Sequence, residues 1–321
     1  MRFHAGGLSR DLRVRKDSHA VRSRPAVTAL SSPLRGGVTG GGKHRCMTTD
    51  LSTIHISTGP EHGAALRARA LPDAEPAPAL EALWARHSDD VQAAQRLRWR
   101  VFVQEMGARL TPPAGTPAGL DVDVFDAHCE HLLVRTVETA HQPAQVVGTY
   151  RVLTPAAARR VGGLYSDSEF DLVRLARLRP QLAELGRSCT APEWRRGGVM
   201  LMLWSQLGIF MQRNGIERVV GCASVPMHDG GHLAADLWHT LRHTHLAPPD
   251  EQVRPRLPLP VQQLGTGRAA EAPALIKAYL KCGGKLLGPP AWDPEFGTAD
   301  LPMMLRLSEM PASHRRRFIG Q

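Results

Sequence analysis

A strand-like segment, a basic glycine turn and an apolar helix follow one another between residues 184 and 214, and this order constrains the fold more than any other feature. The letters run ELGRSCT, then RRGG at 195–198, then VMLMLWSQLGIFMQRN. Backbone N–H groups at a helix start attract anions, and glycine lets a ligand approach the backbone closely. Arg195 and Arg196 add positive charge. The turn is therefore a candidate anion site, with an ordinary solvated strand-to-helix turn as the alternative.

The strand-like segment carries two opposite charges, Glu184 and Arg187, three residues apart. On a regular strand such residues face opposite sides, because side chains alternate. A β-bulge between them would bring both to one face. Two interpretations stay open: a functional pair on one face, or a structural ion pair.

The rest of the chain alternates between patterns typical of strands and of helices. β-Rich segments at 131–138 and 145–153 lie a hairpin length apart, which predicts an antiparallel pair. The other expected strands are 80–87, 184–190, 217–225 and 301–310. The expected helices are 91–106, 168–178, 199–214, 231–246 and 274–284. Alternating elements together with a hairpin indicate an α/β fold with a mixed sheet.

Charge and composition separate a tail from a folded body. The chain of 321 residues has a net charge of +10, but its first 46 residues hold 10 Lys and Arg against two acids. Residues 47–321 are nearly neutral, with 30 basic and 28 acidic residues, so nucleic acid is not an expected partner. We expect a disordered basic and Pro/Ala-rich tail at 1–78, with Met47 as the start codon actually used. A domain at 79–312 follows, with a loop insertion at 247–272, and then a basic end at 313–321.

Cysteine and histidine usage predicts neither disulfides nor a metal centre. The five cysteines have no CxxC spacing, which fits free thiols in a reducing compartment. His128, Glu130 and His131 lie close in sequence but do not complete a ligand set. No run of about 18 apolar residues occurs, so we expect no membrane-spanning helix.

The motifs, in their order, resemble those of the bacterial L-ornithine N-alpha-acyltransferases, a group of GNAT-like acyltransferases. The similarity covers roughly residues 80–310 and includes QRLRWRVFVQEMGA, FDAHCEHLLV, VVGTYRVL, LYSDSEFDL, ELGRSC, GCASV and PPAWDPEFGTADLPMMLRL. The resemblance implies a mostly antiparallel GNAT-like sheet flanked by helices. It also implies transfer of a 3-hydroxyacyl chain from acyl carrier protein to the α-amine of L-ornithine, giving lyso-ornithine lipid. No separate cofactor is expected, because 4′-phosphopantetheine arrives on the carrier protein.

The layout is also similar to that of the acyl-homoserine-lactone synthases, which are GNAT-like as well. The residues that match that pattern are Arg98, Phe102, Asp123, Asp126, Arg151, Glu184 and Arg187. Two departures weaken this likeness. Ala108 stands where the synthases have a tryptophan, and this chain is longer at its C-terminus.

The resemblances assign roles to these residues. Glu184 is the candidate base, and Arg187 would orient it or hold the carboxylate of the amino acid. Arg151 is the other candidate for that carboxylate. Asp123 and Asp126 would bind the δ-ammonium, with a solvated acidic loop as the alternative. Arg98 and Phe102 would line the substrate site, and the donor would bind at Arg195, Arg196, Gly197 and Gly198.

Two other functions remain open from the sequence. One is an acyl-homoserine-lactone synthase. The other is a non-catalytic protein that binds acyl carrier protein or a membrane surface through basic residues. We expect a cytoplasmic protein, with peripheral contact to the inner membrane left open.

Overall fold

The computed structural model describes residues 78–196 and 198–319. The tail expected at 1–78, the proposed start at Met47 and Gly197 lie outside this part, apart from residue 78. The centre of the described part is an eight-stranded sheet in the order β1-β2-β3-β5-β6-β10-β8, with β9 also paired to β10. All strand pairs in it are antiparallel except β5 with β6. The α/β class and the mostly antiparallel sheet are thereby confirmed.

The strands of the main sheet are β1 Leu80–Trp84, β2 Glu130–Thr136, β3 Val146–Leu153, β5 Leu182–Thr190, β6 Arg218–Pro226, β8 Lys285–Leu286, β9 Ala291–Asp293 and β10 Thr298–Arg306. A separate two-stranded sheet joins β4 Phe170–Asp171 to β7 Arg254–Pro255. The α-helices are α1 Ser88–Arg98, α2 Pro155–Val161, α3 Ser166–Glu169, α4 Val199–Arg213, α5 His232–His245, α6 Val261–Leu264, α7 Ala274–Lys281 and α8 Ala312–Ile319. Shorter turns are the π-helix η1 Trp99–Glu105 and the 3₁₀ turns η2 Asp126–His128, η3 Val173–Leu175, η4 Arg179–Gln181, η5 Pro192–Trp194 and η6 Pro249–Glu251.

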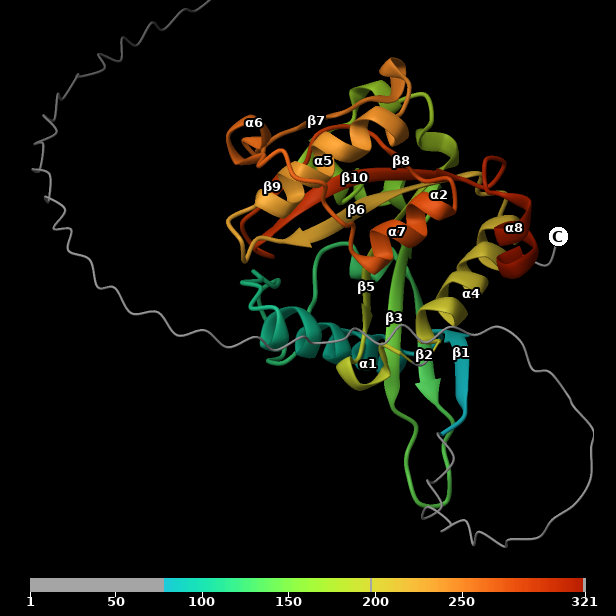
Figure 1. The fold of residues 1–321 in the computed structure, drawn as a ribbon. Helices are drawn as coiled ribbons and strands as arrows, with labels where there is room; N and C mark the ends of the chain where they lie inside the picture. Colours follow the sequence, from blue (N-terminus) through green and yellow to red (C-terminus); the bar gives the residue numbers. More distant parts are fainter. Residues whose placement is uncertain (1–77, 197, 320–321) are drawn as a thin grey trace, which may run out of the picture. The chain divides into compact units, whose positions relative to one another are not determined.

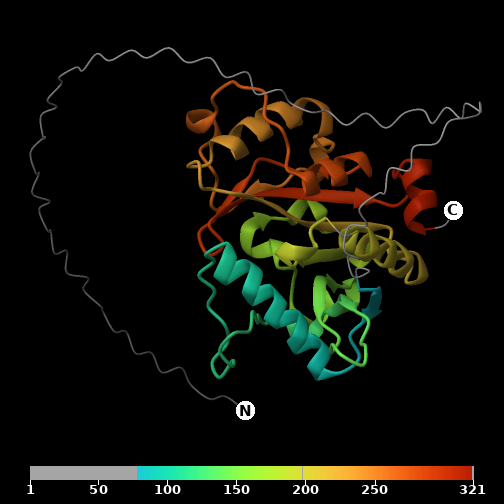
Figure 2. The ribbon, with the colours of Figure 1, turned by 60° about the horizontal axis from the view of Figure 1, so that its bottom comes forward.

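Helices α1 and α4 cover opposite faces of strand β3. Gly148 faces α4 so closely that an added Cβ would lie 2.3 Å from a methyl group of Val199. Arg151, three residues further on, faces the other side and contacts the acids next to α1. Figures 1 and 2 show the blue-green helix α1 along one side of this half of the sheet. The orange helices α5 and α7 lie beside the red strand β10 of the other half.

The two halves of the sheet meet at β5 and β6 and then diverge. The parallel pairing covers only three positions, from Leu182 with Arg218 to Glu184 with Val220. An added Cβ on Gly221 would lie 2.4 Å from the carbonyl oxygen of Leu185, so only glycine fits beside that carbonyl. Beyond these positions β5 and β6 are not paired with each other, and a cavity lies between them.

The prediction of a helix at 168–178 is wrong. Its residues instead form the end of α3, then β4, then η3. Phe170, Leu172 and Leu175 are all buried, and the Asp171 carboxylate accepts the N–H of Val173 at 3.0 Å. Such a local bond competes with the helical one, so the chain turns instead of continuing.

The other expected helices and strands are present, and some elements were not expected. Helix α2 was missed, although Thr154 accepts the N–H of Ala157 as an N-cap and Pro155 opens the helix. The 247–272 segment is mostly loop, with the short elements η6, β7 and α6. Helix α8 begins at residue 312, where we placed the end of the domain, and its Phe318 packs against Trp204 of α4. No helix in the described part of the chain combines the length and apolarity needed to cross a bilayer.

Candidate active site

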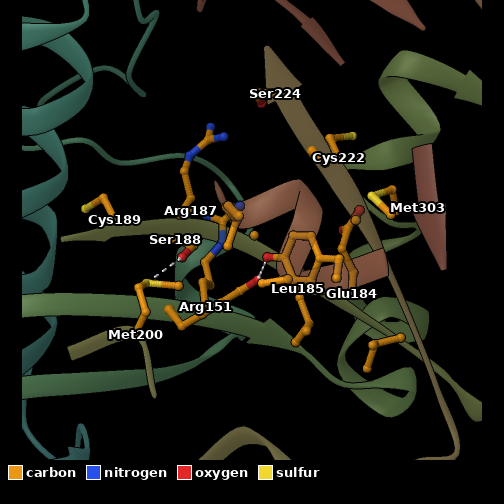
Figure 3. Close-up of a pocket in the computed structure, with 18 of the residues that line it drawn as sticks. Arg151, Glu184, Leu185, Arg187, Ser188, Cys189, Met200, Cys222, Ser224 and Met303 are labelled. Atoms are coloured by element: carbon orange, nitrogen blue, oxygen red, sulfur yellow. Dashed lines mark hydrogen bonds between the residues drawn. The ribbon is translucent and has the colours of Figure 1, made fainter. Parts of the chain in front are cut away.

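A cavity of about 780 Å³ lies where β5 and β6 diverge. Its walls come from the separated ends of these strands, from β9 and β10, and from α4, α7 and α8. Figure 3 shows Glu184, Arg187 and Ser188 of β5 on one side of it, and Cys222 and Ser224 of β6 on the other. Glu184 and Arg187, the two opposite charges noted in the sequence, therefore both lie in the wall of the cavity.

Arg187 occupies a β-bulge, as the spacing of Glu184 and Arg187 suggested. Thr149 pairs with Cys189 while Arg151 pairs with Gly186, so β5 has one more residue than β3 between these points. Arg187 has φ 51°, a left-handed conformation that few non-glycine residues adopt. The bulge lets both Glu184 and Arg187 line the cavity. Strain of this kind persists only where surrounding contacts hold it, and it is common at functional sites.

Glu184 and Arg187 do not form the ion pair that we considered. The Glu184 carboxylate accepts the N–H of Tyr165 at 2.6 Å and the N–H of Ser166 at 2.7 Å. The hydroxyl of Ser166 donates to it as well. Burial raises the pKa of Glu184, and the bonds from Ser166 and Tyr165 oppose that rise only in part. Glu184 is thus a buried carboxylate, 5% exposed, held against the start of α3.

Arg187 belongs instead to a network of three arginines and three aspartates. Its guanidinium contacts Asp121 at 3.4 Å and Asp123 at 3.1 Å. It also lies over the rings of Tyr165 and Phe296, at 4.9 and 4.6 Å from their centroids. Cation–π contacts of this kind fix the plane of a guanidinium.

The predicted substrate residues Arg98, Asp126 and Arg151 form the buried part of this network. Arg98 is fully buried, binds Asp126 at 2.7 and 2.9 Å, and is not in the cavity wall. Arg151 donates to Asp123 at 2.6 Å and to Asp126 at 3.1 Å. Burial opposes ionisation of Asp126, but Arg98 and Arg151 outweigh it and hold its pKa well below its usual range.

This pairing changes the interpretation of the two acids. Asp126 is 6% exposed, so it is not part of a solvated loop. Its carboxylate is already bound by two arginines, as Asp123 is bound by Arg151 and Arg187. The network places Arg151 and Arg187 rigidly at the cavity and leaves its own acids little capacity to bind a substrate ammonium.

Of the remaining predicted residues, Phe102 and Arg195 also line the cavity. Phe102 lines the wall and packs edge-on against Phe296, with ring centroids 5.6 Å apart. Arg195 also lines it and forms a 2.7 Å ion pair with Glu105, while Arg196 is exposed. Gly198 is the residue before α4 and has φ 75°, which glycine tolerates without strain. The free N–H groups of the first turn of α4 follow it.

Several cavity residues were not singled out from the sequence. They are Tyr150, Tyr165, Tyr279, Asp293, Thr298 and Asp300. Asp293 and Asp300 belong to the motif PPAWDPEFGTADLPMMLRL, which carried the family resemblance, but their spacing gave no sign of a shared site. In the described part of the chain, no three His, Cys, Asp or Glu residues are grouped so as to hold a metal ion.

The sequence of residues 97–205 matches the family model of the acetyltransferase (GNAT) domain. This range includes β3, the bulged strand β5 and the first part of α4, which together form one side of the cavity. The fold and the site therefore define a GNAT acyltransferase.

Relatives that match over most of their length identify the family within the GNAT acyltransferases. The chain is 37% identical to the L-ornithine N(alpha)-acyltransferase of Rhodobacter capsulatus over 72% of this chain and 91% of the relative. It is 34% identical to the enzyme of the same name from Agrobacterium fabrum over 75% of this chain and 86% of that protein. The chain belongs to the L-ornithine N(alpha)-acyltransferase family. Among solved structures, the acyl-homoserine-lactone synthase LasI aligns with 76% of this chain and 96% of its own at 12% identity, with a TM-score of 0.42.

Proposed function

We propose that this protein transfers a 3-hydroxyacyl chain from acyl carrier protein to the α-amine of L-ornithine, giving lyso-ornithine lipid. The family supports the amino acid, since the relatives are named for acylation of ornithine on its α-nitrogen. The observation that carries the proposal is the cavity between β5 and β6. It joins the buried Glu184 and Arg187 to the start of α4.

The reaction needs a neutral amine beside an activated thioester. The amine nitrogen attacks the carbonyl carbon, the C–S bond breaks, and an amide and a free thiol result. A base must accept the ammonium proton, and Glu184 is the candidate. Its two oxygens offer about four lone-pair sites, of which Tyr165 and Ser166 occupy three, so one remains for the amine or a bridging water. Its raised pKa brings it closer to neutral pH, where a general base is most effective.

The donor end is assigned to the start of α4. A phosphopantetheine arm carries a phosphodiester, which suits the N–H groups of a helix start together with Arg195 and Arg196. These arginines and Gly198 lie on one short segment, and Arg195 also borders the cavity. Acyl carrier protein is acidic, so the same arginines would meet its surface.

The acyl chain is assigned to the apolar part of the cavity. Met200 and Trp204 of α4, Met303 of β10 and Phe318 of α8 line it. Trp204 stacks on Tyr279, with centroids 5.1 Å apart, and contacts Phe318. A wall of methionine and aromatic side chains suits a flexible hydrocarbon chain. A cytoplasmic location, with peripheral contact to the inner membrane, is part of the same proposal, because the product is an amphiphile.

The test is thiol release from purified acyl carrier protein loaded with a 3-hydroxyacyl chain. We expect release that requires both the enzyme and L-ornithine, and a product whose mass equals that of N-acylornithine. S-adenosylmethionine in place of ornithine should release no thiol. Thiol release with S-adenosylmethionine but not with ornithine would point to a homoserine-lactone synthase. If neither amine leads to thiol release, the proposal is contradicted.

A further inference from the structure

A row of polar side chains crosses the cavity wall on β9, β10 and β6. Asp293 pairs with Thr298 across β9 and β10, and Asp300 pairs with Ser224 across β10 and β6. Thr298 and Asp300 are two residues apart on one strand, so all four side chains share a face of the sheet. All four line the cavity. Carboxylates and hydroxyls thus alternate along one side of an otherwise largely apolar chamber.

The two carboxylates of this row are buried without a cation. Asp293 is 3% exposed and Asp300 is 2% exposed. Among the described residues, no Lys, Arg or His forms an ion pair with either of them. Buried carboxylates are normally paired, because leaving one uncompensated is costly. An unpaired carboxylate in a cavity wall therefore points to a cationic ligand.

Asp300 is the more informative of the two. Asp293 has a structural role, since one of its oxygens accepts the N–H groups of Glu295 and Phe296 at 2.9 and 3.0 Å. Asp300 accepts the Thr298 hydroxyl at 3.0 Å and holds no turn in place. Burial raises the pKa of Asp300 to about 6, the Ser224 hydroxyl opposes that rise, and the charge of Asp293 adds to it. Burial and the neighbouring Asp293 thus both disfavour the charged form of Asp300.

Arg187 lies within electrostatic range of the same place. Burial raises the pKa of Tyr165, Arg187 lowers it, and Asp293 and Asp300 raise it further. The Tyr165 hydroxyl contacts Asp293 at 3.4 Å, and the Arg187 guanidinium lies over the Tyr165 ring. Tyr165 thus contacts a cation, Arg187, through its ring and an anion, Asp293, through its hydroxyl, and Asp293 shares the polar row with Asp300. That arrangement complements an amino acid with an anionic α-carboxylate and a positively charged side chain.

We propose that Asp300, assisted by Asp293, binds the side-chain ammonium of the amino-acid acceptor and selects for it. This inference rests on the proposed function, and it moves the ammonium site away from Asp123 and Asp126, whose carboxylates are bound by arginines. The side-chain ammonium donates to the two carboxylates, and the carboxylate of the acceptor faces Arg187. The α-amine is then free to react at Glu184.

The test compares L-ornithine with L-norvaline, which has the same carbon chain without the δ-amine. We expect the wild-type enzyme to favour ornithine in kcat/KM. In Asp300→Asn that preference should fall about 10- to 100-fold, the range for one charge-assisted hydrogen bond. Turnover of norvaline should be unchanged or higher, which also shows that the variant is folded. Asp293→Asn should reduce the preference in the same direction. Asp250→Asn, at an exposed acid outside the cavity, is the matched control and should leave the preference unchanged.

Three outcomes separate this inference from the proposed function. If wild-type enzyme acylates ornithine and norvaline equally well, or if Asp300→Asn keeps the full preference, the ammonium site is elsewhere. If Asp300→Asn loses both activities to the same extent, Asp300 has a structural role only, and the inference fails. If calorimetry shows that ornithine binds the wild type but not Asp300→Asn, while neither protein transfers an acyl group, the inference stands and the proposed function fails.

Discussion

Replacing Asp300 by asparagine should make the protein more stable at neutral pH, although the residue lies in the candidate active site. The native structure raises the pKa of this carboxyl from 3.8 to about 6, because burial and the nearby Asp293 disfavour its charge. The native state therefore binds this proton more tightly than the unfolded chain does. By linkage, the stability that Asp300 contributes is greatest below pH 4 and is lost as the pH rises towards 6.

The size of the effect follows from the shift. A difference of about two pKa units corresponds to roughly 3 kcal/mol at pH 7, and to about half of that at pH 5. Asp300→Asn removes the charge, so we expect a gain of up to about 3 kcal/mol at pH 7. This is an upper bound, because the asparagine amide must also find hydrogen-bond partners. In a domain of this size the gain corresponds to a melting temperature roughly 6–12 °C higher.

The assay is unfolding of the wild type and Asp300→Asn in urea at pH 5, 6, 7 and 8. The difference between the two proteins should grow with pH up to about 7 and then level off. Taking the difference cancels the titration of groups that the substitution leaves unchanged. A variant that is less stable than the wild type at pH 7, or a gain that does not depend on pH, would refute this reasoning. Saturating ornithine should reduce the gain, because it stabilises the wild type more than the variant.

Three further predictions concern the network, the gap between the strands and the donor end. Arg98→Lys keeps the charge but loses the bidentate contact with Asp126, so urea unfolding should show a loss of about 1.5–3 kcal/mol; an unchanged midpoint would contradict the structural role of Arg98. Gly221→Ala would place a Cβ at 2.4 Å from the Leu185 carbonyl and displace β5, so kcat/KM should fall about 10²-fold, and normal kinetics would exclude a tight fit at this point. Reversing Arg195 and Arg196 to glutamate should raise the KM for acyl carrier protein and flatten its dependence on salt; a KM that ignores both changes would place the docking surface elsewhere.

The local sequence predicted the strand β5 well because its signals are short-range. The spacing of Glu184 and Arg187 suggested a bulge, and the register of β5 against β3 confirms it at Arg187. The glycines of the turn and the apolar run after it predicted α4 within one residue. Helices and turns of this kind depend on neighbours along the chain, so one sequence is enough to find them.

Long-range contacts explain what the sequence did not show. The helix expected at 168–178 is absent because Phe170 joins β4 to β7, more than 80 residues away. The opposite charges at 184 and 187 were considered as partners of each other, but their partners lie at 121–123 and 165–166. Nothing in the local sequence distinguishes Asp300 from other acids in strands. Only the register of the strands shows that it lies near Asp293 and Ser224 in the cavity. Pairings between distant strands leave little trace in a single sequence.

The most direct test of the account is the lipid made by a living cell. A bacterium that lacks ornithine lipids should express the chain, and its lipids should be analysed by mass spectrometry with fragmentation. We predict lyso-ornithine lipid with the 3-hydroxyacyl group on the α-nitrogen. The Glu184→Gln variant, expressed at the same level, should yield about 10²–10⁴-fold less lyso-ornithine lipid, because a positioned base contributes a factor of that size. Cells that make an acyl-homoserine lactone, or that make no acylated ornithine while the protein is folded and abundant, would contradict the account.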